Sequence, residues 1–450
     1  MATAGVRMLE KSQQDSILED LKLDVPLETG FLFQGTHAEI ITGKQEGIYA
    51  WIAVNYALGN FEHQGNPVEA SPYTESAMSV AANPITQETA HVRKRTVGMM
   101  DMGGGSAQIA FEVTNGQEVP NSQLAEVNLG CKQSDKDHKY RIYVTTFLGF
   151  GANVARKRYE QLLTENELSS VIGNISSQSM VGLTKDYPIK DPCLPKGMPD
   201  IVDYHGSTIH LMGTGKLQSC QDHLVQLLNL SAPCLKEPCS FNGVFQPHID
   251  FPNSEFYGFS EYFYTTEDIL RLSGVYDYYH FVQAAQDYCG TDWKTLQKWY
   301  AAKYYPKADE NRFKNQCFKS AWMSTVLHEG HKFPKTYKHL ITARLINGDD
   351  VQWTLGALLY KTRYYPLTEI QTRHSSHIHP IWWGFGRLHS ATYLLLACCG
   401  IAVIAIFIHL RRLKIVRGSD LRKIPSMGYF MTEENQMEEG ILVRNNYYVS

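Results

Sequence analysis

Three consecutive glycines, Gly103 to Gly105, join two apolar stretches of the 450-residue chain. Glycine has no Cβ, so the backbone N–H groups of such a loop can approach a phosphate closely. Asp101, near the end of the first stretch, can hold a hydrated divalent cation through a carboxylate oxygen. Ser106 and Gln108 alternate along the second stretch, so in a strand both side chains would face one cleft. The pattern is that of a metal–nucleotide phosphate site; by itself, such a loop is more often a glycine turn in an ordinary sheet.

A second segment supplies a candidate general base. Residues 40–56 begin like the end of a strand and continue as a helix, with Glu46 near the helix N-terminus. The helix dipole favours a charged carboxylate there, and such a carboxylate can take a proton from a water that attacks phosphorus. The alternative for Glu46 alone is an acidic residue that only stabilises the start of the helix.

These two segments, together with residues 2–7 (ATAGVR), resemble the apyrase family, the nucleoside triphosphate diphosphohydrolases. The motifs stand in the family's order: ATAG-x-R, then G-x-Q-E-G-x-Y-x-W-I-x-x-N-Y, then D-x-G-G-x-S-x-Q. Residues 259–265 and 351–356 also look like family segments. The resemblance covers about residues 1–365 and the expected membrane span. It is greatest to the intracellular, two-span members of the Golgi and endolysosomal type.

The resemblance implies an α/β, actin-like fold with two RNase-H-like lobes and a nucleotide cleft between them. It implies Glu46 as the general base, Ser106 and Gln108 as the residues that orient the attacking water, and Asp101 as the residue that holds a water on the metal. Ca²⁺ or Mg²⁺ is the implied cofactor, and nucleoside di- and triphosphates are the implied substrates. The phosphate- and nucleotide-binding residues that it implies are Thr3, Gly103, Gly104, Tyr264 and Trp353.

Tyr264 is expected to stack on the nucleobase. Our alignment places Glu329 on the opposite side of the base, where relatives often have an arginine. The substitution leaves room for a preference for uridine nucleotides.

The family's first phosphate loop, of the type Asp-x-Gly-Ser-Ser/Thr, has no counterpart in the chain, which starts within the second motif. We therefore expect an incomplete first lobe, with residues 1–39 as its remnant and 346–372 as the segment that returns to it. Residues 40–345 would form the second lobe with its inserts. Because half of the phosphate clamp is missing, we expect little or no hydrolysis by this chain alone. Two alternatives stay open: an inactive membrane protein that acts only through association, and another actin-like enzyme such as a sugar kinase or an exopolyphosphatase.

Residues 391–410 contain no Asp, Glu, Lys or Arg. As a helix they would extend about 30 Å, the thickness of the hydrocarbon core of a bilayer. We expect a transmembrane helix there, preceded by a juxtamembrane stalk at 373–390. Basic residues follow the segment, which predicts a cytosolic tail at 411–450 and a lumenal catalytic domain in Golgi or endolysosomal membranes.

The nine cysteines and two N-x-Ser triplets, at Asn174 and Asn229, agree with a lumenal, glycosylated domain. Cys234 and Cys239 enclose a short segment that suits a local disulfide. The resemblance also suggests the pairs Cys193–Cys220 and Cys289–Cys317, and it leaves Cys131 unpaired. The net charge of −4 gives no case for nucleic-acid binding, and a homo-oligomer stays open.

Several elements must position these groups. The sequence predicts a helix capped by Ser12 and running through Leu21, a strand at 140–144 and a helix at 150–163. Two more helices are expected at 268–286 and 293–304. Residues 62–95 resemble a surface insert, and residues 170–255, rich in Pro, Gly and Cys, are expected to be irregular.

Overall fold

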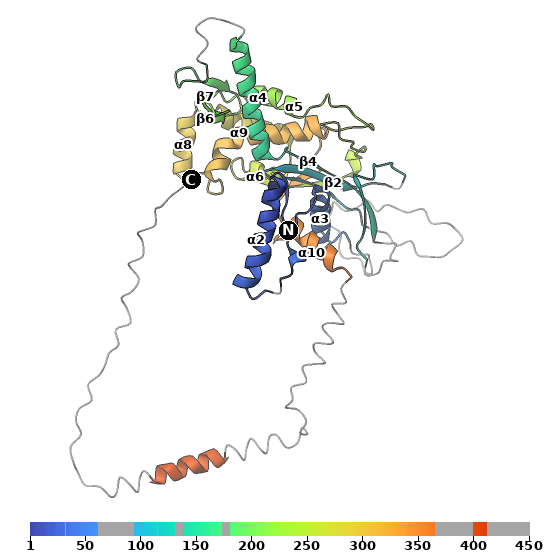
Figure 1. The fold of residues 1–450 in the computed structure, drawn as a ribbon, viewed down its shortest axis with the longest axis vertical. Helices are drawn as coiled ribbons and strands as arrows, with labels where there is room; N and C mark the ends of the chain where they lie inside the picture. The colour runs from blue at the N-terminus through green and yellow to red at the C-terminus, as the bar shows by residue number, and fades with distance from the viewer. Residues whose placement is uncertain are drawn as a thin grey trace, which may run out of the picture. The chain divides into compact units, whose positions relative to one another are not determined.

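The computed structural model describes residues 1–31, 33–61, 94–114, 116–130, 138–172, 181–364 and 399–411. The chain divides into two compact units, residues 1–365 and residues 366–450. The first unit contains a seven-stranded sheet in the order β3-β4-β2-β1-β8-β10-β9. Figure 1 labels two of its strands, β2 and β4. Its strands are β1 (Gly98–Met102), β2 (Ser106–Glu112), β3 (Leu124–Asn128), β4 (Lys139–Leu148), β8 (Phe256–Ser260), β9 (Gly274–Val275) and β10 (Leu340–Thr342).

The sheet is mixed. β1 pairs antiparallel with β2, and β2 pairs antiparallel with β4. On its other side β1 runs parallel to β8, which runs parallel to β10. The edge strands β3 and β9 pair antiparallel with β4 and β10. This arrangement confirms the actin-like α/β fold class, whereas the incompleteness of a first lobe stays a prediction.

Successive residues of the central strands enter two different cores. Met99 and Ala110 belong to an apolar cluster with residues of α3 (Gly43–Ala57). Met100 and Ile109 point the opposite way, into the larger cluster of the molecule. Because side chains alternate along a strand, a sheet buried on both faces needs apolar residues at nearly every position. Asp101, Ser106 and Gln108 interrupt that pattern.

Helices cover the two faces. On the face of Met99, α10 (Trp353–Thr362) packs against α3. The approach is close, because a Cβ added to Gly356 would lie 1.8 Å from the carbonyl oxygen of Tyr49. The opposite core receives side chains from the helices α4 (Ala152–Ile172), α5 (Leu217–Leu227), α6 (Glu261–Glu267), α7 (Tyr278–Gly290), α8 (Trp293–Ala301) and α9 (Glu310–Thr325).

The N-terminal segment forms α1 (Ala4–Arg7) and α2 (Lys11–Glu28). The second helix confirms the one predicted near Ser12, but its N-cap is Glu10, which forms a capping box with Gln13. Short helical turns lie at η1 (Gly35–His37), η2 (Phe251–Asn253) and η3 (Val326–Gly330).

Residues 170–255 are more regular than expected. They contain a three-stranded sheet of β5 (Ile189–Asp191), β7 (Ser207–Gly213) and β6 (Pro199–Tyr204), in that order, and α5. Ile189 and Ile209 join the larger core, so burial stabilises strands that the many turn residues concealed. The predicted helix at 268–286 begins only at Tyr278, after β9. A hairpin of β11 (Leu345–Ile346) and β12 (Asp349–Asp350) precedes α10.

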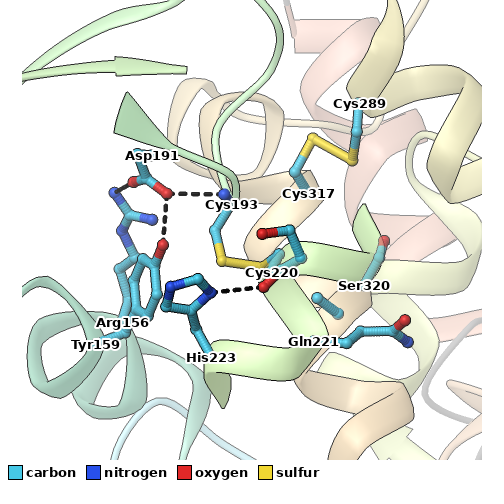
Figure 2. The surroundings of a disulfide bond; sticks show 12 residues. Arg156, Tyr159, Asp191, Cys193, Cys220, Gln221, His223, Cys289, Cys317 and Ser320 are labelled. Carbon is cyan, nitrogen blue, oxygen red and sulfur yellow. Dashed lines mark hydrogen bonds and ion pairs between the residues drawn. A yellow bond between two sulfur atoms is a disulfide. The ribbon is translucent and has the colours of Figure 1, made fainter. Parts of the chain in front are cut away.

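All three predicted disulfides are present: Cys193–Cys220, Cys234–Cys239 and Cys289–Cys317. Figure 2 shows the first of them beside Arg156, Tyr159 and Asp191. Cys131 and Asn174 lie outside the described residues, as do residues 62–93 of the predicted insert.

The predicted membrane segment 391–410 is described only from residue 399, and the stalk and almost all of the tail lie outside the described residues. Over the part of the chain that the structure describes, no helix combines the length and apolar character that a membrane crossing requires.

Candidate active site

The β1–β2 hairpin carries five of the predicted site residues: Asp101, Gly103, Gly104, Ser106 and Gln108. Asp101 stands opposite Gln108 in the antiparallel register, and the N–H of Gly103 donates to the carbonyl of Ser106 at 2.9 Å across the turn. The amide of Gln108 donates to the hydroxyl of Ser106 at 2.7 Å, and both side chains are buried. The expected common orientation of Ser106 and Gln108 is therefore present.

The glycine loop is held by the start of α4. The N–H of Ala152 donates to the carbonyl of Gly103 at 2.9 Å, and the N–H of Asn153 donates to that of Gly104 at 3.1 Å. These bonds satisfy donors that an α-helix leaves free at its N-terminus. They also fix the direction in which the loop carbonyls point.

Gly151 was not identified from the sequence, yet the loop depends on it. A Cβ at this position would lie 2.4 Å from the backbone nitrogen of Ser106 and 2.5 Å from that of Gly105. The signal was available, because Gly149-Phe150-Gly151 separates a strand pattern from a helix pattern. A glycine at such a junction often marks a close approach of two backbones.

The N-terminal segment packs on the same loop through Ala4. A Cβ on Gly105 would lie 3.2 Å from the Cβ of Ala4, so the residue after Thr3 packs on the glycines. Thr3 is the N-cap of α1, and its carbonyl accepts from the N–H of Arg7 at 3.1 Å. Ala2 bridges to Ile40, which leads into α3. Thus the segment links the glycine loop with the helix that carries Glu46.

Two glycines set the position of α3. Cβ atoms on Gly43 and Gly47 would lie 2.5 Å from the hydroxyl of Thr146 and 2.6 Å from a methyl group of Val144. The first turn of α3 therefore lies directly on β4, and Thr146 is the register partner of Gln108. Thr42 caps this helix by accepting from the N–H of Gln45 at 3.1 Å.

Glu46 lies in the first turn of α3, and only 7% of its surface is exposed. Its carboxylate accepts from the guanidinium of Arg7 at 2.8 Å, and Arg7 also donates to the carbonyl of Ile41 at 2.9 Å. Burial raises the pKa of Glu46, and the Arg7 ion pair opposes that rise. The charge of Asp101 raises the same pKa further, and the amide of Gln108 lowers it.

The packing of Gly43 and Gly47 on β4 brings Glu46 to the face of the sheet that carries Asp101 and Gln108, although more than fifty residues separate Glu46 from the hairpin. With Ser106 bonded to Gln108, the structure brings together all the residues predicted to act on water or metal. A carboxylate, an amide and a hydroxyl in one buried cluster can bind and deprotonate a water molecule.

Asp101 provides the test of whether a cation fits. Its Oδ1 atom is buried and has no hydrogen-bond partner within the described residues. Burial also raises the pKa of Asp101, and the hydroxyl of Ser260 lowers it. An unpaired buried carboxylate oxygen is costly, and a hydrated divalent cation would satisfy it. Within the described ranges no group of three or more His, Cys, Asp or Glu could hold a metal. Asp101 is the residue that would hold a hydrated cation here.

The residue that lies on the ring of Tyr264 is Arg312, not Glu329. The guanidinium carbon of Arg312 is 4.0 Å from the ring centroid. Asp268 holds the guanidinium at 2.9 Å. Arg312 and Glu329 lie on one continuous helical stretch, α9 and η3, so about 25 Å of helix axis separates them. The expected position of Glu329 opposite Tyr264 is wrong.

Trp353 is not brought into this cluster. It begins α10, is partly buried, and packs against the apolar cluster of Ile41, Tyr49 and Ala357. Its position supports the docking of α10 on α3, and hence the placement of Glu46, through packing.

The sequence matches a known protein family. A model of the GDA1/CD39 (nucleoside phosphatase) family matches residues 1–376. Ectonucleoside triphosphate diphosphohydrolase 7 of Xenopus tropicalis is 44% identical over 94% of this chain and 68% of the relative. Ectonucleoside triphosphate diphosphohydrolase 4 of Mus musculus is 44% identical over 96% of this chain and 70% of the relative.

A more distant relative is nucleoside-diphosphatase mig-23 of Caenorhabditis elegans, which is 38% identical over 82% of this chain and 62% of its own length. Among solved structures, nucleoside triphosphate hydrolases from Neospora caninum align with a TM-score of 0.52 at 16% identity, covering 82% of this chain and 72% of that one. The structural match supports the fold alone.

Proposed function

The chain belongs to the GDA1/CD39 nucleoside phosphatase family, and from this premise we propose that it hydrolyses nucleoside tri- and diphosphates to monophosphates and phosphate. The observation that carries the proposal is the packing of α3 on β4, which brings the buried Glu46 to the face of the sheet that carries Gln108 and Asp101 beside the glycine loop. The names of the relatives, which describe triphosphate diphosphohydrolases and a nucleoside-diphosphatase, support the substrate class.

Water attacks the terminal phosphorus directly in the proposed reaction, with no phosphoenzyme. Glu46 takes the proton of the water, while Ser106 and Gln108 orient the oxygen. The glycine loop and Thr3 face the phosphates, where backbone N–H groups stabilise developing charge. Ca²⁺ or Mg²⁺, when bound near Asp101, would offset the negative charge of the phosphate oxygens.

We further propose that Tyr264 and Arg312 form the base subsite. An aromatic ring and a guanidinium both offer flat faces to a nucleobase. Arg312 belongs to α9, and Asp268 at the C-terminal end of α6 holds its guanidinium. The uridine preference rested on Glu329 beside Tyr264, so that reason no longer supports it. Relative kcat/KM values for UDP, ADP and GDP test the preference directly.

Membrane location in Golgi or endolysosomal vesicles, with the first unit lumenal, is also part of the proposal. Three disulfides suit an oxidising compartment. Asn229 of the second N-x-Ser triplet is exposed and so accessible for glycosylation. Glycosidase-sensitive mobility and protection from protease in sealed vesicles are the expected results. A non-glycosylated chain cleaved from the cytosolic side would contradict this orientation.

The decisive experiment measures phosphate release by the purified full chain from UDP, ADP and ATP with Ca²⁺ or Mg²⁺. The expected result is cation-dependent release that Glu46→Gln abolishes. Release in water without a sugar acceptor excludes a sugar kinase, and failure to cleave polyphosphate disfavours an exopolyphosphatase. A folded wild-type chain that releases no phosphate would favour the inactive, association-only alternative.

A further inference from the structure

The three disulfides of the described residues differ in their access to solvent. Two of them are formed by cysteines that are 0% exposed: Cys193, Cys220, Cys289 and Cys317 (Figure 2). Cys234 and Cys239 form the third, and both are only half-buried. All four residues between them are exposed, and Leu235 is 98% exposed. The Cys234–Cys239 disulfide is therefore the one that a dissolved thiol can approach from the surface.

A cavity of about 330 Å³ lies against this disulfide. Both cysteines line it, and the other lining residues are Leu230, Ala232, Glu237, Pro238, Ser240 and Gly243. The volume is at the lower end of the range of small-ligand sites. Exchange between a thiol and a disulfide requires a thiolate to reach one of the two sulfur atoms, so its rate depends on access. The cavity gives a small thiol the room for that approach.

Backbone acceptors for the reduced cysteines are already in place. The carbonyl oxygen of Lys236 lies 3.3 Å from the sulfur of Cys234 and 3.3 Å from that of Cys239. The carbonyl oxygen of Gly243 lies 3.5 Å from the sulfur of Cys239. A disulfide has no S–H group to donate, whereas a thiol is a weak donor. These carbonyls can therefore accept hydrogen bonds from the cysteines only after reduction, and the backbone around the bridge suits the dithiol form.

Contacts other than the bridge hold this segment to the fold. The N–H of Gln246 donates to the carbonyl of Pro238 at 2.9 Å, and the buried rings of Phe241 and Phe245 belong to the larger core. The bridge also closes a short ring, because its cysteines are 5 residues apart, against 27 and 28 for the other two pairs. A cross-link that closes a shorter ring stabilises the fold less. Reduction of this disulfide should therefore leave the fold intact.

We propose that the Cys234–Cys239 disulfide is a thiol-exchange site, which low-molecular-weight thiols reduce while the rest of the fold persists. A thiolate attacks the sulfur of one cysteine, the S–S bond of the bridge breaks, and a mixed disulfide forms. The released cysteine thiolate takes a proton from water. A second small thiol attacks the mixed disulfide at the sulfur of the first, which frees the second cysteine. Two small thiols are thereby oxidised to their disulfide, and Cys234 and Cys239 are reduced.

The test is a time course of reduction of the purified full chain by an excess of free cysteine. Free thiols, including that of Cys399, are first blocked with N-ethylmaleimide. New thiols are then labelled with iodoacetamide and located by mass spectrometry. Label at Cys234 and Cys239 should appear at least about tenfold faster than at the four buried cysteines, which react only when the fold opens. Circular dichroism at the same times should show folded protein, and early samples should carry a cysteine adduct on Cys234 or Cys239.

The control is the double variant Cys234→Ser, Cys239→Ser. It should lack the early label and the cysteine adduct, while the buried pairs react as slowly as in the wild-type chain. The wild-type time course decides the question by itself if this variant does not fold. The proposal is overturned if a buried pair is labelled first, if all three pairs are reduced together as the protein unfolds, or if the exposed pair stays oxidised until unfolding. None of these outcomes bears on nucleotide hydrolysis, because neither cysteine takes part in the proposed reaction.

Discussion

Two buried carboxylates of this chain differ in how completely their oxygens are satisfied. Both oxygens of Asp191 have partners: Arg156 at 2.9 Å, the hydroxyl of Tyr159 at 2.7 Å and the N–H of Cys193 at 2.7 Å (Figure 2). Around Asp101, one carboxylate oxygen is buried without a hydrogen-bond partner in the described residues.

The contrast separates two uses of a buried carboxylate. A fully paired charge holds structure, since removing a partner leaves an uncompensated charge in the interior. A partly unpaired one carries a cost that a ligand can relieve. Asp191 joins α4, β5 and the Cys193–Cys220 disulfide, whereas Asp101 ends a strand beside the glycine loop. The structure thus distinguishes the two roles by their hydrogen bonding, before any assay.

The largest effect is expected from Glu46→Gln. Without a base to accept the proton of water, kcat should fall about 10²- to 10⁴-fold, while the fold remains. Phosphate release and circular dichroism measure the two properties. Glu165→Gln, an exposed carboxylate changed in the same way, is the control and should retain full activity. Unchanged activity in Glu46→Gln would show that Glu46 is not the general base. The cluster of Glu46 and Asp101 would then have no demonstrated catalytic role to set against the structural role of Asp191.

The matching change in the paired cluster is Asp191→Ala. It strips Arg156 and Tyr159 of their shared partner, so the free energy of unfolding should fall by about 3–5 kcal/mol. Urea unfolding of the oxidised protein provides the measurement. Glu126→Ala, at an exposed position of β3, should change stability little. A stable Asp191→Ala protein would show that the pairing of Asp191 is dispensable. Hydrogen bonding would then not distinguish a structural carboxylate from a ligand-binding one in this chain.

The cluster around Asp101 depends on a fixed position of the glycine loop, and Gly151→Ala tests this dependence. The added Cβ would collide with the glycine-loop backbone, so stability should fall by about 1–3 kcal/mol and nucleotide affinity should fall with it. Gly290→Ala is the matched control, because a Cβ there meets nothing within 4 Å. Equal behaviour of the two variants in thermal unfolding and nucleotide titration would argue against the loop contact.

The smallest effect is expected from Asp101→Asn, which should raise stability, whereas Asp191→Ala and Gly151→Ala should lower it. Burial raises the pKa of Asp101 in the folded state, so the ionised form destabilises the fold above the pKa of the unfolded chain. The amide should therefore add about 0.5–2 kcal/mol of stability at neutral pH.

The gain should shrink as pH falls and the wild-type carboxyl becomes protonated. Urea titrations at several pH values, without divalent cation, measure it. A destabilised Asp101→Asn protein at neutral pH would mean that the unpaired oxygen is not costly. Calcium titration should show weaker cation-dependent nucleotide binding in the same variant.

The site could be predicted from the sequence where short-range geometry decides it. Ser106 and Gln108 must share a face in any strand, and Glu46 must lie near the start of any helix that begins at Gly43. The meeting of Glu46 with the hairpin depends on Gly43 and Gly47 packing on β4, which only the family resemblance anticipated.

Other features depended on tertiary structure. Arg312 was missed because its ring partner, Tyr264, comes from another helix, and an error in alignment moved the expected residue to Glu329. Residues 170–255 were expected to be irregular because their many turn residues hide strands that burial of Ile189 and Ile209 stabilises. Gly151 stands at a recognisable junction between a strand pattern and a helix pattern, but the sequence does not reveal that the backbone it touches is that of Gly105 and Ser106.

The antiparallel register of β1 and β2 also constrains how this region can change. Asp101 lies two residues from Met99 in β1, and Gln108 lies two residues from Ala110 in β2. Side chains two residues apart in a strand face the same side of the sheet, so Asp101 and Gln108 face α3, as Met99 and Ala110 do. Insertion of one residue before Asp101 within β1 would turn the carboxylate into the larger apolar core and Met100 or Met102 toward α3. Insertion of two would restore the facing. The hairpin is therefore expected to tolerate length changes only in pairs, a parity rule that a substitution scan alone would not reveal.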